Sequence, residues 1–174
     1  MLLEKSMHLN PDRRLRRLKY KDAQRMLLWM HDDSVVEYFA QDFRQKTFED
    51  CLMFIEKSWK DKKNLHLAAA DQEDNYLGTV SLKNIRGGSA EFAIVICPDA
   101  MGTGLSAEAM KEMIRLGFED MNLKWIYWCV SKKNQKALRF YDKNQYRRVP
   151  ESEAAAYAGE GQRQGLIWYC ERKL

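Results

Sequence analysis

The segment from residue 90 to residue 119 constrains the fold of this chain more than any other. It begins with the apolar, β-branched run AEFAIVIC, passes through a proline and a loop containing Gly102 and Gly104, and continues as SAEAMKEMIRLGFE. Charged residues at spacings of three and four leave an apolar face opposite them, which predicts an amphipathic helix over about 106–119. The segment is therefore interpreted as a strand, a glycine loop and a helix.

The glycine loop has the properties of an anion site. The first N–H groups of the following helix lack intrahelical partners, and the helix dipole places partial positive charge there. Glycines let the backbone close around a ligand without a Cβ clash. The pattern suits a phosphate, although it lacks the Gly-Lys-Ser/Thr of a P-loop and the third glycine of a dinucleotide-binding motif. A plain β-to-α turn is the alternative.

The remaining elements follow from periodicity and from turn residues. Thr47 and Asp50 form a capping-box pattern at the start of a helix that reaches about Lys60. WIYWCV is the continuous apolar run expected of a buried strand. We predict strands over 15–18, 65–71, 76–85, 90–97 and 125–130, followed by two closing strands in YRRVP and LIWYCE. We also predict a helix that begins at Asp22, a short helix within 32–39, and helices over 47–60 and 134–144. This order indicates a mixed α/β fold.

Composition limits the class of protein. The 174 residues are 45% hydrophobic and 31% charged, which fits a single globular domain over 1–174. Because no run of 18 apolar residues and no signal-peptide core is present, we expect a cytoplasmic protein without a membrane partner. The four cysteines form no C-x-x-C pair, so we expect free thiols and no metal.

Basic residues concentrate in PDRRLRRLKYK, residues 11–21. Six cations stand there against Asp12, a sum of +5, whereas the formal net charge of the whole chain is +4. The cluster can serve nucleic acid, a ligand phosphate, or only a solvated face. Because it lacks interleaved aromatic residues beyond Tyr20, we expect no nucleic-acid partner.

The glycine loop and the segment VSKKNQKALRFYDKNQY together resemble the GCN5-related N-acetyltransferases, in the branch of ribosomal-protein alanine and polyamine acetyltransferases. The family loop, Gln/Arg-x-x-Gly-x-Gly/Ala, corresponds here to residues 101–106, and the family's later Asn and Tyr-x-x-x-Gly-Phe correspond to Asn134, Tyr141 and Tyr146. The resemblance implies a mostly antiparallel, twisted sheet of six to seven strands. It also implies a splayed parallel pair and about four helices.

Three positions depart from the family pattern. Met101 replaces the usual Gln or Arg and removes one side-chain contact to phosphate, whereas Ser106 is small enough to fit. Gln145 holds the place of the glycine after the helix. If that position requires positive φ, Gln145 is strained by about 1 kcal/mol, unless Asn144 takes the left-handed conformation instead.

The resemblance implies acetyl-CoA as cosubstrate. The pantetheine arm would contact backbone groups of the strand before the loop, and the diphosphate would take the loop amides, with Asn134 contacting the cofactor as well. Asn134 is alternatively only the N-cap of its helix. The implied cofactor-binding residues are Ile94, Val95, Ile96, Met101, Gly102, Thr103, Gly104, Leu105, Ser106 and Asn134.

Two residues are candidates for proton transfer. Tyr141 matches the family's general acid, since a phenol is neutral at pH 7 and can donate to the leaving sulfur; alternatively it is only a buried aromatic. Strand alternation places Glu91 on one face with Val95 and Cys97, where a carboxylate can serve as base through water. Otherwise Glu91 is a surface residue. Some relatives carry a glutamate in the following parallel strand, where this chain has Cys129.

The resemblance implies that the acceptor is a primary amine of a small molecule, amino sugar, polyamine or protein N-terminus. Acidic residues of the second predicted helix, Asp32, Asp33 and Glu37, would attract it; alternatively they are only charges at a helix start. The segment 151–165 is expected to be a flexible connection that covers the acceptor mouth. The closing strand LIWYC can serve as the edge of a homodimer or belong only to the core. The alternatives are a non-catalytic acyl-CoA sensor and a basic RNA- or ribosome-associated protein.

Overall fold

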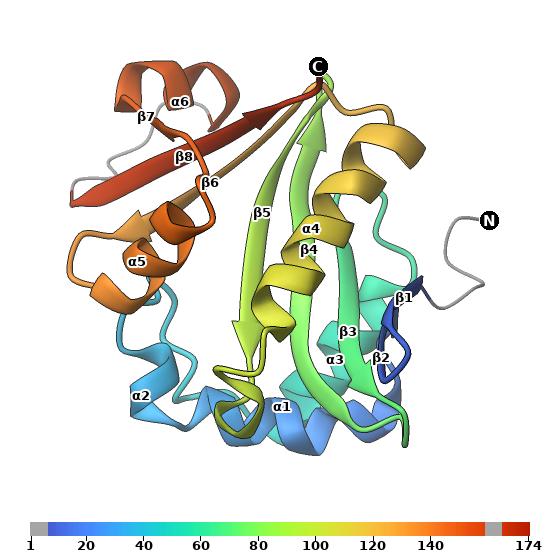
Figure 1. The fold of residues 1–174 in the computed structure, drawn as a ribbon. Helices are drawn as coiled ribbons and strands as arrows, with labels where there is room; N and C mark the ends of the chain where they lie inside the picture. The colour runs from blue at the N-terminus through green and yellow to red at the C-terminus, as the bar shows by residue number, and fades with distance from the viewer. Residues whose placement is uncertain (1–6, 159–164) are drawn as a thin grey trace.

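The computed structural model describes residues 7–158 and 165–174, which form one twisted sheet covered by helices on both faces (Figure 1). The strand order is β1-β2-β3-β4-β5-β6-β8-β7, and among these pairs only β5 and β6 run parallel. The strands are β1 Met7–Asn10, β2 Arg13–Arg17, β3 Leu65–Asp71, β4 Tyr76–Arg86, β5 Ser89–Ile96, β6 Trp125–Ser131, β7 Arg148–Val149 and β8 Leu166–Arg172.

The helices divide between the two faces. In Figure 1, α4 crosses the front of the sheet and α1 and α3 lie behind it. The α-helices are α1 Ala23–Met30, α2 Asp33–Val36, α3 Phe48–Ser58, α4 Leu105–Arg115, α5 Gln135–Lys143 and α6 Glu151–Ala158; a π-helical turn, Leu116–Asp120, continues α4. No helix in the described ranges is long and apolar enough to cross a membrane.

The expected fold class is confirmed, with eight strands instead of six or seven and six α-helices instead of four in the described residues. The additional strand β1 is only four residues long, too short to show a period in sequence. The expected connection over 151–165 begins as helix α6, which packs Ala154 and Tyr157 against β6 and β8. Residues 159–164 of that connection lie outside the described residues.

Two apolar clusters fix the orientation of β5. Phe92, Ile94 and Ile96 face the core beneath α4, while Val95 and Cys97 face the cluster beneath α1 and α3. Alternation therefore places Glu91 on the α1–α3 face, as predicted from sequence. The sheet thus separates a compartment beneath α4 from a compartment beneath α1 and α3.

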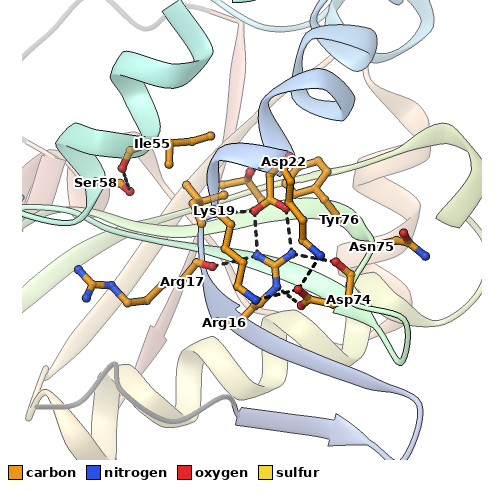
Figure 2. Close-up of polar contacts among 12 residues, drawn as sticks. Arg16, Arg17, Lys19, Asp22, Ile55, Ser58, Asp74, Asn75 and Tyr76 are labelled. Atoms are coloured by element: carbon orange, nitrogen blue, oxygen red, sulfur yellow. Dashed lines mark hydrogen bonds and ion pairs between the residues drawn. The ribbon is translucent and has the colours of Figure 1, made fainter.

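The basic segment near the N-terminus is largely neutralised inside the fold (Figure 2). Arg16 is 5% exposed, and its guanidinium makes a bidentate pair with Asp22 at 2.8 and 2.9 Å. Asp74 accepts from four cations of the segment, at 2.5–2.9 Å: Arg14, Arg16, Lys19 and Lys21. The two other basic residues also have protein partners: Arg17 donates to the Trp59 carbonyl, and Arg13 pairs with Glu108. Each of the six cations therefore has a partner within the fold, and Arg16 among them is buried.

Candidate active site

The gap between β5 and β6 is the central feature of the site. Parallel pairing joins Ser89–Glu91 to Trp125–Tyr127, and the strands then diverge (Figure 1). On its other edge β6 stays paired with β8 along its whole length, from Trp125 to Ser131. Beyond Glu91, β5 is therefore paired in the described structure only with β4.

The register decides which backbone groups of β5 face this gap. The Cys97 amide donates to the Leu77 carbonyl of the β4 side at 2.8 Å. Because backbone groups alternate along a strand, Val95 also faces β4, whereas Ile94 and Ile96 present their N–H and C=O groups to the gap. Of the three β5 residues predicted to contact a cofactor, Ile94 and Ile96 are thus placed for backbone contact, and Val95 is not.

The glycine loop lies at the open end of the gap. Gly102 and Gly104 have φ of 75° and 86°, a region that favours glycine, and Gly104 is the N-cap of α4 without a side-chain cap. The Thr103 hydroxyl donates to the Ala100 carbonyl at 2.6 Å and braces the turn. No acceptor in the described residues bonds the amides of Gly102, Thr103, Gly104, Leu105 and Ser106. A row of free donors at a helix start fits a diphosphate.

Helix α5 brings a cation to the same place. Lys136 Nζ lies 3.2 Å from Met101 Sδ, so an ammonium group stands beside the loop position that lacks the family's polar side chain. Asn134 caps α5, with its Oδ1 accepting from the Ala137 amide at 3.1 Å. The capping role of Asn134 is confirmed, and no acceptor in the described part of the chain bonds its side-chain NH2.

Tyr141 lies on the buried face of α5, in the main apolar core, and is 7% exposed. Its ring packs against Trp128 at 5.5 Å and Tyr169 at 5.1 Å between centroids. Burial, followed by the nearby Tyr169 and Tyr146, raises the pKa of Tyr141 far above the ordinary value. The phenol therefore stays protonated at neutral pH and keeps a proton to donate.

Glu91 lies on the opposite face of the sheet from Tyr141. Its Oε1 pairs with Lys83 Nζ at 3.3 Å, and its Oε2 accepts from Asn84 Nδ2 at 3.0 Å. The carboxylate is mostly buried, with 15% of its side chain exposed. Glu91 and Tyr141 are therefore not in contact, and they lie on opposite faces of the sheet.

Two of the three acidic residues expected at the acceptor mouth, Asp32 and Asp33, have partners within the protein. Asp32 caps α2 by accepting from the Ser34 amide at 2.9 Å, and Asp33 pairs with Arg44 at 2.6 Å. An open depression of about 500 Å³ lies instead on the β3–β4 side of the glycine loop, lined by Asp12, Arg13, Asp71, Gln72, Glu73, Leu77, Asp99, Ala100 and Thr103. No residue of β6 or α5 lines this depression, so it is separate from the gap.

Known proteins share this architecture. A family model described as an acetyltransferase (GNAT) domain matches residues 13–147. Acetyltransferase PseH of Campylobacter jejuni is 24% identical over 129 residues, covering 74% of this chain and 79% of that protein. Spermidine N(1)-acetyltransferase of Vibrio cholerae is 25% identical over 136 residues, covering 77% and 78%.

A solved structure extends the similarity to the fold. The crystal structure of spermidine N-acetyltransferase from Vibrio cholerae, in complex with CoA and spermine, has a TM-score of 0.78 at 22% identity. It covers 94% of this chain and 96% of the other. The family match spans most of the sequence and includes the gap, the glycine loop and Tyr141. The chain therefore belongs to the acetyltransferase (GNAT) domain family.

Proposed function

We propose that this acetyltransferase transfers acetyl from acetyl-CoA directly to a primary amine of a small molecule. The proposal rests on one observation: unpaired backbone groups run from the edge of β5 into the glycine loop. Backbone groups of Ile94 and Ile96 line the gap, and the amides of residues 102–106 follow at its end. The pantetheine arm would lie along β5, with the diphosphate on the loop and Lys136 and Asn134 beside it.

The reaction needs one bond made, one broken and one proton delivered. The amine nitrogen attacks the thioester carbonyl carbon, and the C–S bond breaks as the tetrahedral oxyanion collapses. Tyr141 gives its phenolic proton to the leaving sulfur, and the proton lost by the amine balances this transfer. A backbone N–H of the β5 edge would stabilise the oxyanion.

Glu91 is the proposed proton acceptor on the amine side. An alkylammonium must lose a proton before it can attack, because its pKa lies near 10. Glu91 faces the compartment of α1–α3 and α6, from which the amine would enter, while Tyr141 acts from the other side. Lys83 and Asn84 hold the carboxylate in place, so we propose that the proton passes through a water molecule.

A polyamine is the first acceptor to examine, because spermidine N-acetyltransferase of Vibrio cholerae is similar to this chain both in sequence and in its solved structure. The test is release of CoA thiol from acetyl-CoA with polyamines, amino sugars, amino acids and N-terminal peptides. Calorimetry with CoA alone should show binding. Binding without transfer to any amine would indicate an acyl-CoA sensor instead, and absence of binding would refute the proposed cofactor site.

A further inference from the structure

Glu108 places a negative charge beside the proposed diphosphate site. It lies in the first turn of α4, and its Oε1 is 4.0 Å from the position that a Cβ on Gly104 would take. An acidic residue there favours the helix, because it complements the helix dipole. The same carboxylate would repel an anionic ligand on the loop unless another group neutralises it.

Arg13 of β2 neutralises this carboxylate from the far end of the sequence. Its guanidinium NH1 lies 3.2 Å from Glu108 Oε2, and Asn10 Nδ2 donates to the same oxygen at 2.9 Å. The side chains of Arg13 and Glu108 are only 21% and 33% exposed, so solvent screens the pair incompletely. The other basic side chains of residues 11–21 are bonded elsewhere, to Asp74, Asp22 and Trp59.

Arg13 also holds the backbone of the glycine loop. Its NH1 donates to the Thr103 carbonyl at 3.1 Å. In a trans peptide the carbonyl and the following N–H point in opposite directions. A Thr103 carbonyl turned toward Arg13 therefore directs the Gly104 N–H away from Arg13, and that N–H is one of the donors without an acceptor in the described chain.

We propose that Arg13 is a positioning residue for the coenzyme diphosphate. It fixes the Thr103–Gly104 peptide and cancels the charge of Glu108. The inference rests on the proposed function, since it concerns the same loop. It assigns a specific role to one member of the basic segment, for which the sequence alone leaves nucleic acid, a ligand phosphate and a solvated face open.

The test compares cofactor binding among three variants. Arg13→Met keeps the apolar stem and removes the cation, and we expect it to raise the KM for acetyl-CoA about fivefold to twentyfold, with kcat changed less than about twofold. Adding Glu108→Gln to Arg13→Met should restore most of the affinity. Arg17→Met, from the same strand, should leave the KM unchanged.

A truncated substrate separates this role from a merely structural one. Acetyl-pantetheine lacks the diphosphate, so wild type and Arg13→Met should use it equally well. An equal loss with both substrates would show that Arg13 acts through the fold and would overturn the proposal. Failure of the wild type to bind CoA by calorimetry would instead refute the proposed function, so the two failures are distinguishable.

Glu108→Gln alone provides a second route if Arg13→Met folds poorly. It removes the negative charge and retains an amide oxygen for Arg13. We expect it to tighten CoA binding about twofold to fivefold at low ionic strength, with the gain shrinking as salt is added. Unchanged CoA affinity in this variant at low salt would contradict the electrostatic half of the proposal.

Discussion

Tyr169 donates its hydroxyl to Asp142 at 2.9 Å, while its ring lies 5.1 Å from that of Tyr141, the residue next to Asp142 in α5. The Tyr169 ring also stacks on Trp128, with centroids 5.5 Å apart and planes 4° from parallel. Arg148 completes the arrangement through a bidentate pair with Asp142. These contacts hold α5 against β6 and β8 without using the hydroxyl of Tyr141.

Tyr141→Phe should therefore lower turnover and leave the fold intact. We expect kcat to fall about 10²-fold to 10⁴-fold, the usual contribution of a general acid, with CoA affinity and melting temperature nearly unchanged. Thiol release and calorimetry measure the two effects. Tyr146→Phe, which alters another tyrosine of the same aromatic cluster, is the control. Wild-type kcat in Tyr141→Phe would exclude the acid role.

Gly102→Ala should weaken acetyl-CoA binding more than it destabilises the protein. A Cβ at Gly102 meets no atom within 4 Å, so the cost to the fold is the strain of φ 75°, about 1 kcal/mol. Gly87→Ala is a matched control, since Gly87 has φ 55° and equally open surroundings away from the loop. Both variants should lose similar stability in urea unfolding. Only Gly102→Ala should raise the KM for acetyl-CoA.

Gln145→Gly should stabilise the protein by about 1 kcal/mol. Gln145 has φ 62°, and α5 ends in a Schellman motif in which the Tyr146 amide donates to the Tyr141 carbonyl at 3.1 Å. Glycine adopts this conformation without the Cβ penalty. Asn144 has φ −84°, so Asn144→Gly should destabilise instead. Chemical denaturation of the two variants gives the comparison, and equal effects would contradict it.

Stability should fall between pH 6.5 and pH 4 because of His66. Burial, partly opposed by Asp61 and aided by Lys83, lowers the pKa of His66 from 6.5 to about 4. Within this window the unfolded chain binds a proton that the folded chain does not. Folding stability contributed by His66 is therefore complete above pH 6.5 and decreases as pH falls, by at most about 3 kcal/mol.

His66→Gln should remove this part of the pH dependence. Glutamine can still bond the Ser81 hydroxyl, which lies 2.7 Å from His66 Nδ1 in the wild type. Urea unfolding of both proteins at several pH values gives the difference in slope. Parallel stability curves for wild type and variant across this window would show that His66 does not take up the proton on unfolding.

Asp74→Asn should destabilise the protein by about 2–4 kcal/mol. Burial raises the pKa of Asp74, but hydrogen bonds from the four surrounding cations outweigh it and hold the pKa far below its usual range. Loss of the charge leaves those cations, including the buried Arg16, to repel one another. Asparagine tolerates the φ of 65° at this position. Asp42→Asn, at an exposed pair, should cost less than about 0.5 kcal/mol.

Local patterns in the sequence determined most of the secondary structure and the chemical character of the loop. The capping box of Thr47 and Asp50 begins α3 as predicted, and β3 has the predicted bounds, 65–71. The left-handed conformation falls on Gln145 as the family pattern implies, and not on the alternative, Asn144. Such features depend on neighbours within a few residues, so they can be read along the chain.

Tertiary structure alone decided which groups meet. The Arg13–Thr103 contact spans 90 residues, the Lys136–Met101 contact 35, and Asp74 collects cations from more than 50 residues away. No local period encodes these distances. The parallel pairing of β5 with β6 over only Ser89–Glu91 is likewise decided in the tertiary structure, since strand pairing is a choice among partners distant in sequence. The gap and the charges around it therefore exist only once the sheet has formed.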